Sequence, residues 1–341
     1  MGIEPMDFFK GRRILLISPR FFGYETKIIN HLKSLGSDVH FLDERPGNSF
    51  LVKGLIRLHS VLSPPLARSY FKRALAALHA VRFDDVLVIS PEFFDEGTIQ
   101  QVRETQPAAR IILYMWDSLI NKGWTGHRAT SFLAGFDRTF SFDDVDATHY
   151  GMSLRPLFYS STVPRQDDVA STFAFSFIGT IHSDRYRVLK DMKRCATARG
   201  FPTFIYPFLP SKYIYWFYRL TKPEFKGTKL ADFQLSSLPY DQVMAVFKAS
   251  SCIVDIEHPG QRGLTMRTLE VIGSGKHLIT TNPNIRKYPF YSPDRVTVID
   301  RHQATLPDPM PEPRLVSEEE TYALSLHGWC EDIFRGSPHQ R

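Results

Sequence analysis

A single carboxylate, Glu270, lies inside an otherwise apolar run with helical spacing, in the segment "GLTMRTLEVIGSGKHLITTN" (263–282). In a helix, Arg267 would lie three residues earlier on the same face. A carboxylate near the start of a helix can accept both hydroxyls of a ribose, while Arg267 and the backbone N–H groups of the preceding glycine loop hold phosphate. The alternative is an ordinary surface ion pair, which would contribute only about 0.2–0.5 kcal/mol.

A second group of polar residues follows the strand-like run "FAFSFIGT". The end of this run and the turn after it supply four candidate phosphate ligands, namely Gly179, Thr180, His182 and Ser183. Ser183 suits the N-cap of a following helix, whose N-terminus favours phosphate, and Arg185 could pair with phosphate bidentately. The alternative is a plain strand–turn–helix with a solvated arginine. Neither G-x-G-x-x-G nor G-x-x-x-x-G-K-[ST] occurs in the sequence, so this is not a dinucleotide or P-loop fingerprint.

Candidates for acid–base catalysis come from other strand ends. Asp117 follows the apolar run in "LYMWDSLINKGW", where a carboxylate could remove a proton from an acceptor hydroxyl. The N-cap of a helix is an equally good interpretation of Asp117. Glu92 and His182 are the other catalytic candidates, followed by Glu25 and His127.

Metal binding is not expected. The densest acidic group, Asp143, Asp144 and Asp146, is explained by the start of a helix, which favours negative charge. Three cysteines lie far apart without a C-x-x-C pair, which argues against a zinc site or a disulfide framework and suits a reducing cytoplasm.

These residues need elements to position them, and the chain alternates strand-like and helix-like segments, which predicts parallel sheets covered by helices. In the first half, strands are expected at 13–18, 38–43, 84–90, 110–116 and 138–142, and helices at 25–36, 49–62, 66–82 and 95–105. In the second half, strands are expected at 173–180, 203–208, 251–257, 277–282 and 296–300, with helices starting near Ser183, Leu264 and Ser317.

The polar segment 161–172 between the halves reads as a linker. We therefore expect two Rossmann-like α/β domains, with the chain divided into 1–162, a linker at 163–172, a second domain at 173–315, and a helical segment at 316–341 that crosses back to the first domain. Ligands of open parallel sheets bind beyond the carboxyl ends of the strands. The rule selects these segments: 18–24, 90–94, 116–122, 142–144, 179–185, 256–263 and 281–284.

Charge indicates the partners. The net charge of +6 and the pI near 9.1 favour an anionic partner, either nucleic acid, an anionic membrane or a phosphorylated substrate. Two basic stretches, 46–83 and 192–223, contain no Asp or Glu, and the second includes "YIYWFY" (213–218). Such residues suit an anionic membrane surface, although core helices with solvated basic backs are the alternative, most of all for 66–82. No nucleic-acid module is present, and no apolar run reaches the length of a membrane span.

The stretch "HPGQRGLTMRTLE…GKHLITTN" resembles the C-terminal half of GT-B glycosyltransferases, in particular the CgeB-like group and enzymes of capsule and lipopolysaccharide synthesis. "ISPRFFGYE" and "FIGTIHSDRY" suit the same group. In that family two glutamates lie about eight residues apart, and Glu270 matches the second, which binds the ribose. Arg262 stands where the first glutamate would be, so recognition of the donor sugar would differ from the common pattern.

The resemblance implies a metal-independent glycosyltransferase with a nucleotide sugar as co-substrate and no bound cofactor. It implies donor contacts at the loop and helix start Gly263, Leu264 and Thr265, at Arg267 and Glu270, and near the base at Pro239 and Tyr240. The acceptor would be a glycan or lipid-linked glycan of the lipopolysaccharide, capsule or exopolysaccharide type, met at the cytoplasmic face of the inner membrane. A nucleotide-sugar epimerase on the same fold, or a non-catalytic nucleotide-binding protein, are the alternatives.

Overall fold

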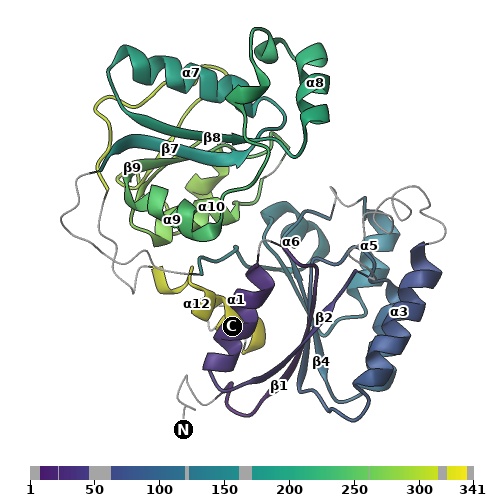
Figure 1. Ribbon diagram of the computed structural model, residues 1–341. Helices are drawn as coiled ribbons and strands as arrows, with labels where there is room; N and C mark the ends of the chain where they lie inside the picture. The colour runs from purple at the N-terminus through teal and green to yellow at the C-terminus, as the bar shows by residue number, and fades with distance from the viewer. Residues whose placement is uncertain are drawn as a thin grey trace. The chain divides into compact units, whose positions relative to one another are not determined.

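The computed structural model describes residues 8–21, 23–45, 63–119, 123–160, 171–260, 262–313 and 321–335. The chain divides into two compact units (Figure 1). Unit 1 comprises Met1–Pro156 and Leu326–Arg341, and unit 2 comprises Leu157–Ser325. The segment 49–62, the centre of the expected linker and the helix start near Ser317 lie outside the described residues.

Unit 1 contains a parallel sheet in the order β2-β1-β3-β4-β5-β6. β3 is buried along its whole length, and β1 and β4 nearly so, as expected of parallel strands that are covered by helices on both faces. The strands are β1 (Arg13–Ser18), β2 (Asp38–Asp43), β3 (Asp85–Ile89), β4 (Arg110–Met115), β5 (Arg138–Ser141) and β6 (Ser153–Leu154).

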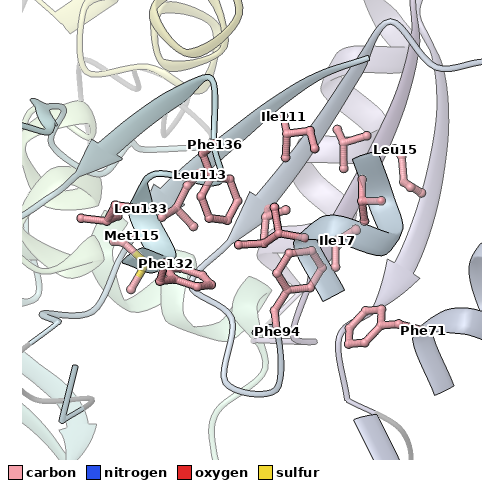
Figure 2. Packing of buried hydrophobic residues seen from close by; sticks show 14 of the residues in the cluster. Leu15, Ile17, Phe71, Phe94, Ile111, Leu113, Met115, Phe132, Leu133 and Phe136 are labelled. Atoms are coloured by element: carbon pink, nitrogen blue, oxygen red, sulfur yellow. The ribbon is translucent and has the colours of Figure 1, made fainter. Parts of the chain in front are cut away.

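Helices of unit 1 present apolar stripes to this sheet. Figure 2 shows Phe71, Phe94 and Phe132 packed with side chains of β1 and β4 in one continuous core. The helices are α1 (Tyr24–Ser34), α3 (Ser63–Ala77), α4 (Glu96–Thr105), α5 (Gly126–Leu133) and α6 (Asp144–Tyr150). In α3, Ala67, Phe71 and Leu75 are buried whereas the basic residues Arg68, Lys72 and Arg73 are exposed. The structure thus favours the core-helix interpretation of this basic segment.

The last described helix, α12 (Leu326–Phe334), belongs to unit 1 although it follows unit 2 in sequence. Its Trp329 is fully buried, and the ring lies edge-on to that of Tyr114 in β4 at 4.8 Å. Arg138 of β5 donates a hydrogen bond to the backbone oxygen of Ile333 at 2.8 Å. Both the apolar core and the strand ends of unit 1 are therefore completed by this returning helix.

Unit 2 contains a second parallel sheet in the order β11-β10-β9-β7-β8. Its strands are β7 (Phe173–Thr180), β8 (Thr203–Phe208), β9 (Ser250–Asp255), β10 (His277–Thr280) and β11 (Val296–Val298). Its helices are α7 (Arg185–Ala198), α8 (Lys212–Thr221), α9 (Tyr240–Lys248) and α10 (Met266–Gly273). The predicted class, two Rossmann-like α/β domains with a returning C-terminal helix, is confirmed.

Candidate functional site

A charged network joins four strand ends of unit 2. Arg301 follows β11, and its Nη1 donates to Asp184 Oδ1 at 2.6 Å while its Nη2 donates to the backbone oxygen and the carboxylate of Glu257. Thr281, after β10, donates to Glu257 Oε2 at 2.5 Å. Because Asp184 follows β7 and Glu257 follows β9, this network brings four loops together at the carboxyl edge, where ligands of parallel sheets bind.

Arg185 ties the same loops through the backbone. Its Nη1 donates to the oxygen of Thr180 at 2.7 Å, and its Nη2 donates to the oxygen of Ile256, so it links the ends of β7 and β9. Burial lowers the pKa of Arg185, and the nearby carboxylates of Asp255 and Glu257 act in the opposite direction. The guanidinium stays charged and places a positive charge close to Gly179. A Cβ at Gly179 would lie only 3.0 Å from the ring of Phe177, so a side chain there would be crowded.

The expected N-cap at Ser183 is wrong. α7 begins at Arg185 with Asp184 as its N-cap, and Ser183 adopts the left-handed conformation with φ 50°. The chain turns at Ser183, one residue before the N-cap. The backbone oxygen of Ser183 accepts a hydrogen bond from Lys222. The residue instead lies beside His182, whose Nδ1 is 3.3 Å from Ser183 Oγ.

His182 lies among positive charges. Burial, followed by the charges of Arg185 and His258, lowers the pKa of His182 to about 4. The imidazole rings of His182 and His258 have centroids 5.6 Å apart. At neutral pH His182 is therefore uncharged, and it can donate or accept a hydrogen bond but adds no positive charge for phosphate.

The start of α10 is held to the end of β9. Thr265 is the N-cap and accepts a hydrogen bond from the N–H of Thr268 at 3.1 Å. Both hydroxyls donate to Asp255 Oδ2, at 2.5 Å from Thr265 and 2.7 Å from Thr268. The helix N-terminus, with Gly263 and Leu264 before it, is thereby fixed at the carboxyl edge of the sheet.

Glu270 lies in the second turn of α10 and is only 5% exposed. Arg267 Nη1 donates to Glu270 Oε2 at 3.3 Å, and the guanidinium carbon of Arg267 lies 5.0 Å from the centroid of the Phe247 ring. The predicted Arg–Glu pair thus exists, but it is largely buried rather than a solvated surface pair. Such a carboxylate is held in one place by its neighbours.

Pro239 and Tyr240 lie at the beginning of α9, as its N-cap and first residue. α9 leads directly into the amino end of β9, so its own N-terminus points toward the carboxyl edge of the sheet. The structure therefore places all the predicted donor-site segments of unit 2 on one edge of one sheet.

The catalytic candidates of unit 1 lie at the carboxyl edge of its own sheet. Asp117 follows β4 and accepts a hydrogen bond from Ser90 Oγ at 3.3 Å. Ser118 and Leu119 are not helical, and residues 120–122 of the segment that would follow an N-cap at Asp117 lie outside the described residues, so the N-cap interpretation stays an alternative. Glu92 accepts a hydrogen bond from Arg45 at 3.2 Å.

Of the two further candidates, Glu25 accepts a hydrogen bond from the N–H of Phe21 at 3.1 Å. His127 lies on the exposed face of α5, with its Nδ1 3.2 Å from the hydroxyl of Ser131. Both side chains therefore have local contacts on their own segments.

Sequence reasoning missed two groups. Glu44, after β2, is buried, and its Oε2 accepts the N–H groups of Glu92 and Phe93 at 3.0 Å each; burial is the main cause that raises the pKa of Glu44 to about 7. The network of Arg301, Glu257 and Asp184 was missed as well. Applying the carboxyl-end rule to the strands expected at 38–43 and 296–300 would have found Glu44 and Arg301.

Asp143 caps α6 and accepts the N–H groups of Val145 and Asp146, as a helix start requires. Within the described ranges no group of three or more His, Cys, Asp or Glu side chains is arranged to hold a metal ion. Nor does that part of the chain contain a helix long and apolar enough to cross a membrane.

Several solved structures that are similar to this chain are glycosyltransferases. HepE (Alr3699) of Anabaena, in complex with UDP-glucose, has a TM-score of 0.54 at 10% identity over 85% of this chain and 86% of its own. The α-glucosyltransferase AGT in complex with UDP has a TM-score of 0.53 at 12% identity over 86% and 88%. An α-glucosyltransferase with UDP-glucose and DNA containing an abasic site has a TM-score of 0.52 at 13% identity over 79% and 80%.

The chain has a GT-B fold. At these identities the likeness establishes the architecture of two Rossmann-like domains and confirms the expected fold class. No protein-family model matches the sequence, and no curated protein matches it. The more specific resemblance to the CgeB-like group stays a prediction.

Proposed function

We propose that this chain is a glycosyltransferase that moves a sugar from a nucleotide-sugar donor to a glycan or lipid-linked acceptor. The observation that carries the proposal is the convergence of charged and polar side chains from β7, β9, β10 and β11 at one edge of the second sheet. The GT-B proteins of similar structure were solved with UDP or UDP-glucose, which supports a nucleotide-sugar donor here too.

In this proposal unit 2 holds the donor. The diphosphate contacts the turn from Gly179 to Ser183 and the N-terminus of α10, with Arg185 and Arg267 supplying positive charge. Glu270 accepts the ribose hydroxyls, and Pro239 and Tyr240 flank the base. His182, uncharged at neutral pH, donates a hydrogen bond rather than a charge.

The acceptor would bind unit 1, with Asp117 as the first candidate for the base that removes the acceptor proton and Glu92 as the second. Backbone amides and arginines would stabilise the departing nucleoside diphosphate without a metal ion. Transfer that persists in excess EDTA is the expected result, and loss of transfer with recovery on adding Mg²⁺ or Mn²⁺ would contradict it.

We assign the acceptor to the lipopolysaccharide, capsule or exopolysaccharide class, reached from the cytoplasmic face of the inner membrane by a peripheral protein. The basic composition supports an anionic surface as a partner. Several solved structures of an α-glucosyltransferase of similar fold contain DNA, so a DNA acceptor belongs in the same assay as a comparison.

A screen of nucleotides by calorimetry tests the proposal. We expect one of UDP, GDP, CMP or dTDP to bind, and its sugar derivative to be consumed faster when acceptor is added. Absence of binding by all of them would remove the enzyme interpretation. Donor turnover that does not depend on acceptor would favour an epimerase, and binding without turnover would favour a non-catalytic protein.

A further inference from the structure

The exposed face of α8 is apolar. Tyr213, Trp216, Phe217 and Leu220 are 74%, 55%, 61% and 87% exposed, and their spacing of three and four residues puts them on a single stripe of the helix. Among the described residues these four make up half of the large hydrophobic side chains that are strongly exposed. A contiguous exposed apolar stripe of this kind marks an interaction surface.

The opposite face of α8 anchors the helix, so the stripe cannot turn inward. Tyr215 is 1% exposed, and its hydroxyl donates to the backbone oxygen of Thr228 at 2.8 Å. Arg219 Nη1 donates to the same oxygen at 2.8 Å, and the Tyr215 ring packs against Phe233 with centroids 5.6 Å apart. The helix follows the edge strand β8 and lies at the periphery of its unit (Figure 1).

The segments next to the stripe are mainly basic, with Glu224 and Asp232 as the acidic residues that follow α8. Residues 192–223 contain no Asp or Glu. Lys212 begins α8, Lys226 and Lys229 follow it, and all three are exposed. Lys190 of α7 donates to the backbone oxygen of Glu224 at 3.4 Å, which brings the basic helix α7 beside the segment after α8. The partner of this surface must therefore accept apolar side chains and carry negative charge.

We propose that α8 is a membrane-docking helix, which lies in the headgroup layer of an anionic bilayer with Tyr213, Trp216, Phe217 and Leu220 directed toward the acyl chains. Tryptophan and tyrosine favour the membrane–water interface, and lysines beside them are attracted by anionic lipids. The purpose of this docking rests on the proposed function, because it would hold the donor-binding unit at the surface that contains the lipid-linked acceptor.

A second copy of this chain fits the surface less well. A two-fold contact would place the stripe against itself and would also set the flanking lysines of both copies against one another. A nucleic acid would satisfy the charge and could stack on the aromatic rings, but Leu220, the most exposed of the four, has no partner there.

Trp216 provides a direct readout. Of the four tryptophans it alone is exposed, since Trp116, Trp124 and Trp329 are 9%, 7% and 0% exposed. Vesicles of phosphatidylcholine with about a third phosphatidylglycerol should shift the tryptophan emission to shorter wavelength and sediment the protein. The emission shift should be absent in Trp216→Phe, and sedimentation should weaken as salt is raised.

The decisive comparison uses two double variants. Trp216→Ser/Phe217→Ser should lower vesicle binding by about tenfold or more, because two side chains leave the interface. Leu154→Ser/Leu235→Ser, which removes two exposed leucines elsewhere, should bind like the unchanged protein. The proposal would be overturned if the two double variants bound the anionic vesicles equally. It would also be overturned if the unchanged protein bound pure phosphatidylcholine vesicles as strongly as anionic ones.

Other occupants give their own signals. A dimer in solution that becomes monomeric in Trp216→Ser/Phe217→Ser, without vesicle binding, would assign the stripe to a second copy. Oligonucleotide binding that depends on the same residues, again without vesicle binding, would assign it to nucleic acid. Either result overturns the membrane proposal. The vesicle assay contains no nucleotide, so its failure is separate from failure of the donor-binding proposal.

Discussion

At the residue scale, the small residues after Glu270 have a packing role. A Cβ at Gly273 would lie 2.4–2.7 Å from three ring atoms of Tyr159, which is itself buried. Gly275, with φ 70°, takes the left-handed position that ends the helix. The glycine-containing turn therefore lets α10 end against an aromatic ring and lead directly into β10.

Gly273→Ala should lower the free energy of unfolding by up to about 2 kcal/mol. Overpacking against the buried ring costs about 1–3 kcal/mol and exceeds the gain in helix propensity of about 1 kcal/mol. In a Tyr159→Ala background the same change should become neutral or stabilising, because only the propensity gain remains. Urea unfolding measures both. Gly260→Ala, whose Cβ would meet only His258 at 3.6 Å, is the control, and an equal loss there would contradict the packing account.

His182 makes stability depend on pH. Its pKa is about 4 in the folded protein and about 6.5 when unfolded, so between these values the unfolded state binds protons that the folded state does not. The stability contributed by neutral His182 is complete above pH 6.5 and is lost as pH falls toward 4. From pH 7 to 5 the loss is at most about 2 kcal/mol, and less because the ring is half-exposed.

His182→Gln should therefore flatten the fall in unfolding free energy between pH 7 and pH 5, measured by urea unfolding at both values. His127→Gln, which alters an exposed ring on α5, should leave the fall unchanged. A fall of the same size in all three proteins would show that His182 is not held neutral by its neighbours.

At the element scale, the parallel strands were predictable because buried β-branched runs separated by helix-length segments permit few other arrangements. The residues at which the strands end were less predictable. The strands expected at 251–257 and 277–282 finish at Asp255 and Thr280, because the following residues turn away to form the network of Glu257, Thr281 and Arg301. No local pattern indicates such a turn, since its cause lies in loops far apart in sequence.

The helices, too, were predictable only in part. The amphipathic pattern of α3 identified the face that packs on the core. It did not show what the opposite, basic face contacts. In the structure this face is exposed, and Arg68 pairs with Asp95 at 2.7 Å. For α8, six consecutive bulky residues indicated that not all could face one core. Only the structure showed that Tyr215 is buried and Ile214 packs against the core, whereas Trp216 and Phe217 are exposed.

Trp329→Ala should destabilise unit 1 specifically, because it empties a fully buried site against Tyr114. Truncation of a buried tryptophan costs about 3–5 kcal/mol. Hydrogen exchange should speed up at the amides of β1 and β4 and stay slow at those of β7 and β9. Trp216→Ala, an exposed position, should change neither set, and uniform acceleration over both units would contradict the assignment of α12 to unit 1.

At the scale of the whole molecule, the fold class followed from the order of elements, and the likeness to glycosyltransferases of known structure supports it independently. The candidate site of unit 2 was predictable in outline because the carboxyl-end rule selects the edge of the parallel sheet at which its charged network lies. Arg301 and Glu44 follow two expected strands whose ends were not among the selected segments. Ser183 was given the wrong local role because contacts between loops far apart in sequence are set by tertiary packing.

The central claim is that Glu270 binds the ribose of a nucleotide at this edge. It is tested most directly by the affinity of the best-binding nucleoside diphosphate and of its 2′,3′-dideoxy analogue, for the unchanged protein and for Glu270→Gln. The unchanged protein should lose about ten- to a hundredfold in affinity with the analogue, because hydrogen bonds to a charged group contribute about 1.5–3 kcal/mol. Glu270→Gln should bind the natural nucleotide more weakly and discriminate much less, while Glu224→Gln behaves like the unchanged protein. Equal loss of affinity for the analogue in all three proteins would contradict the account.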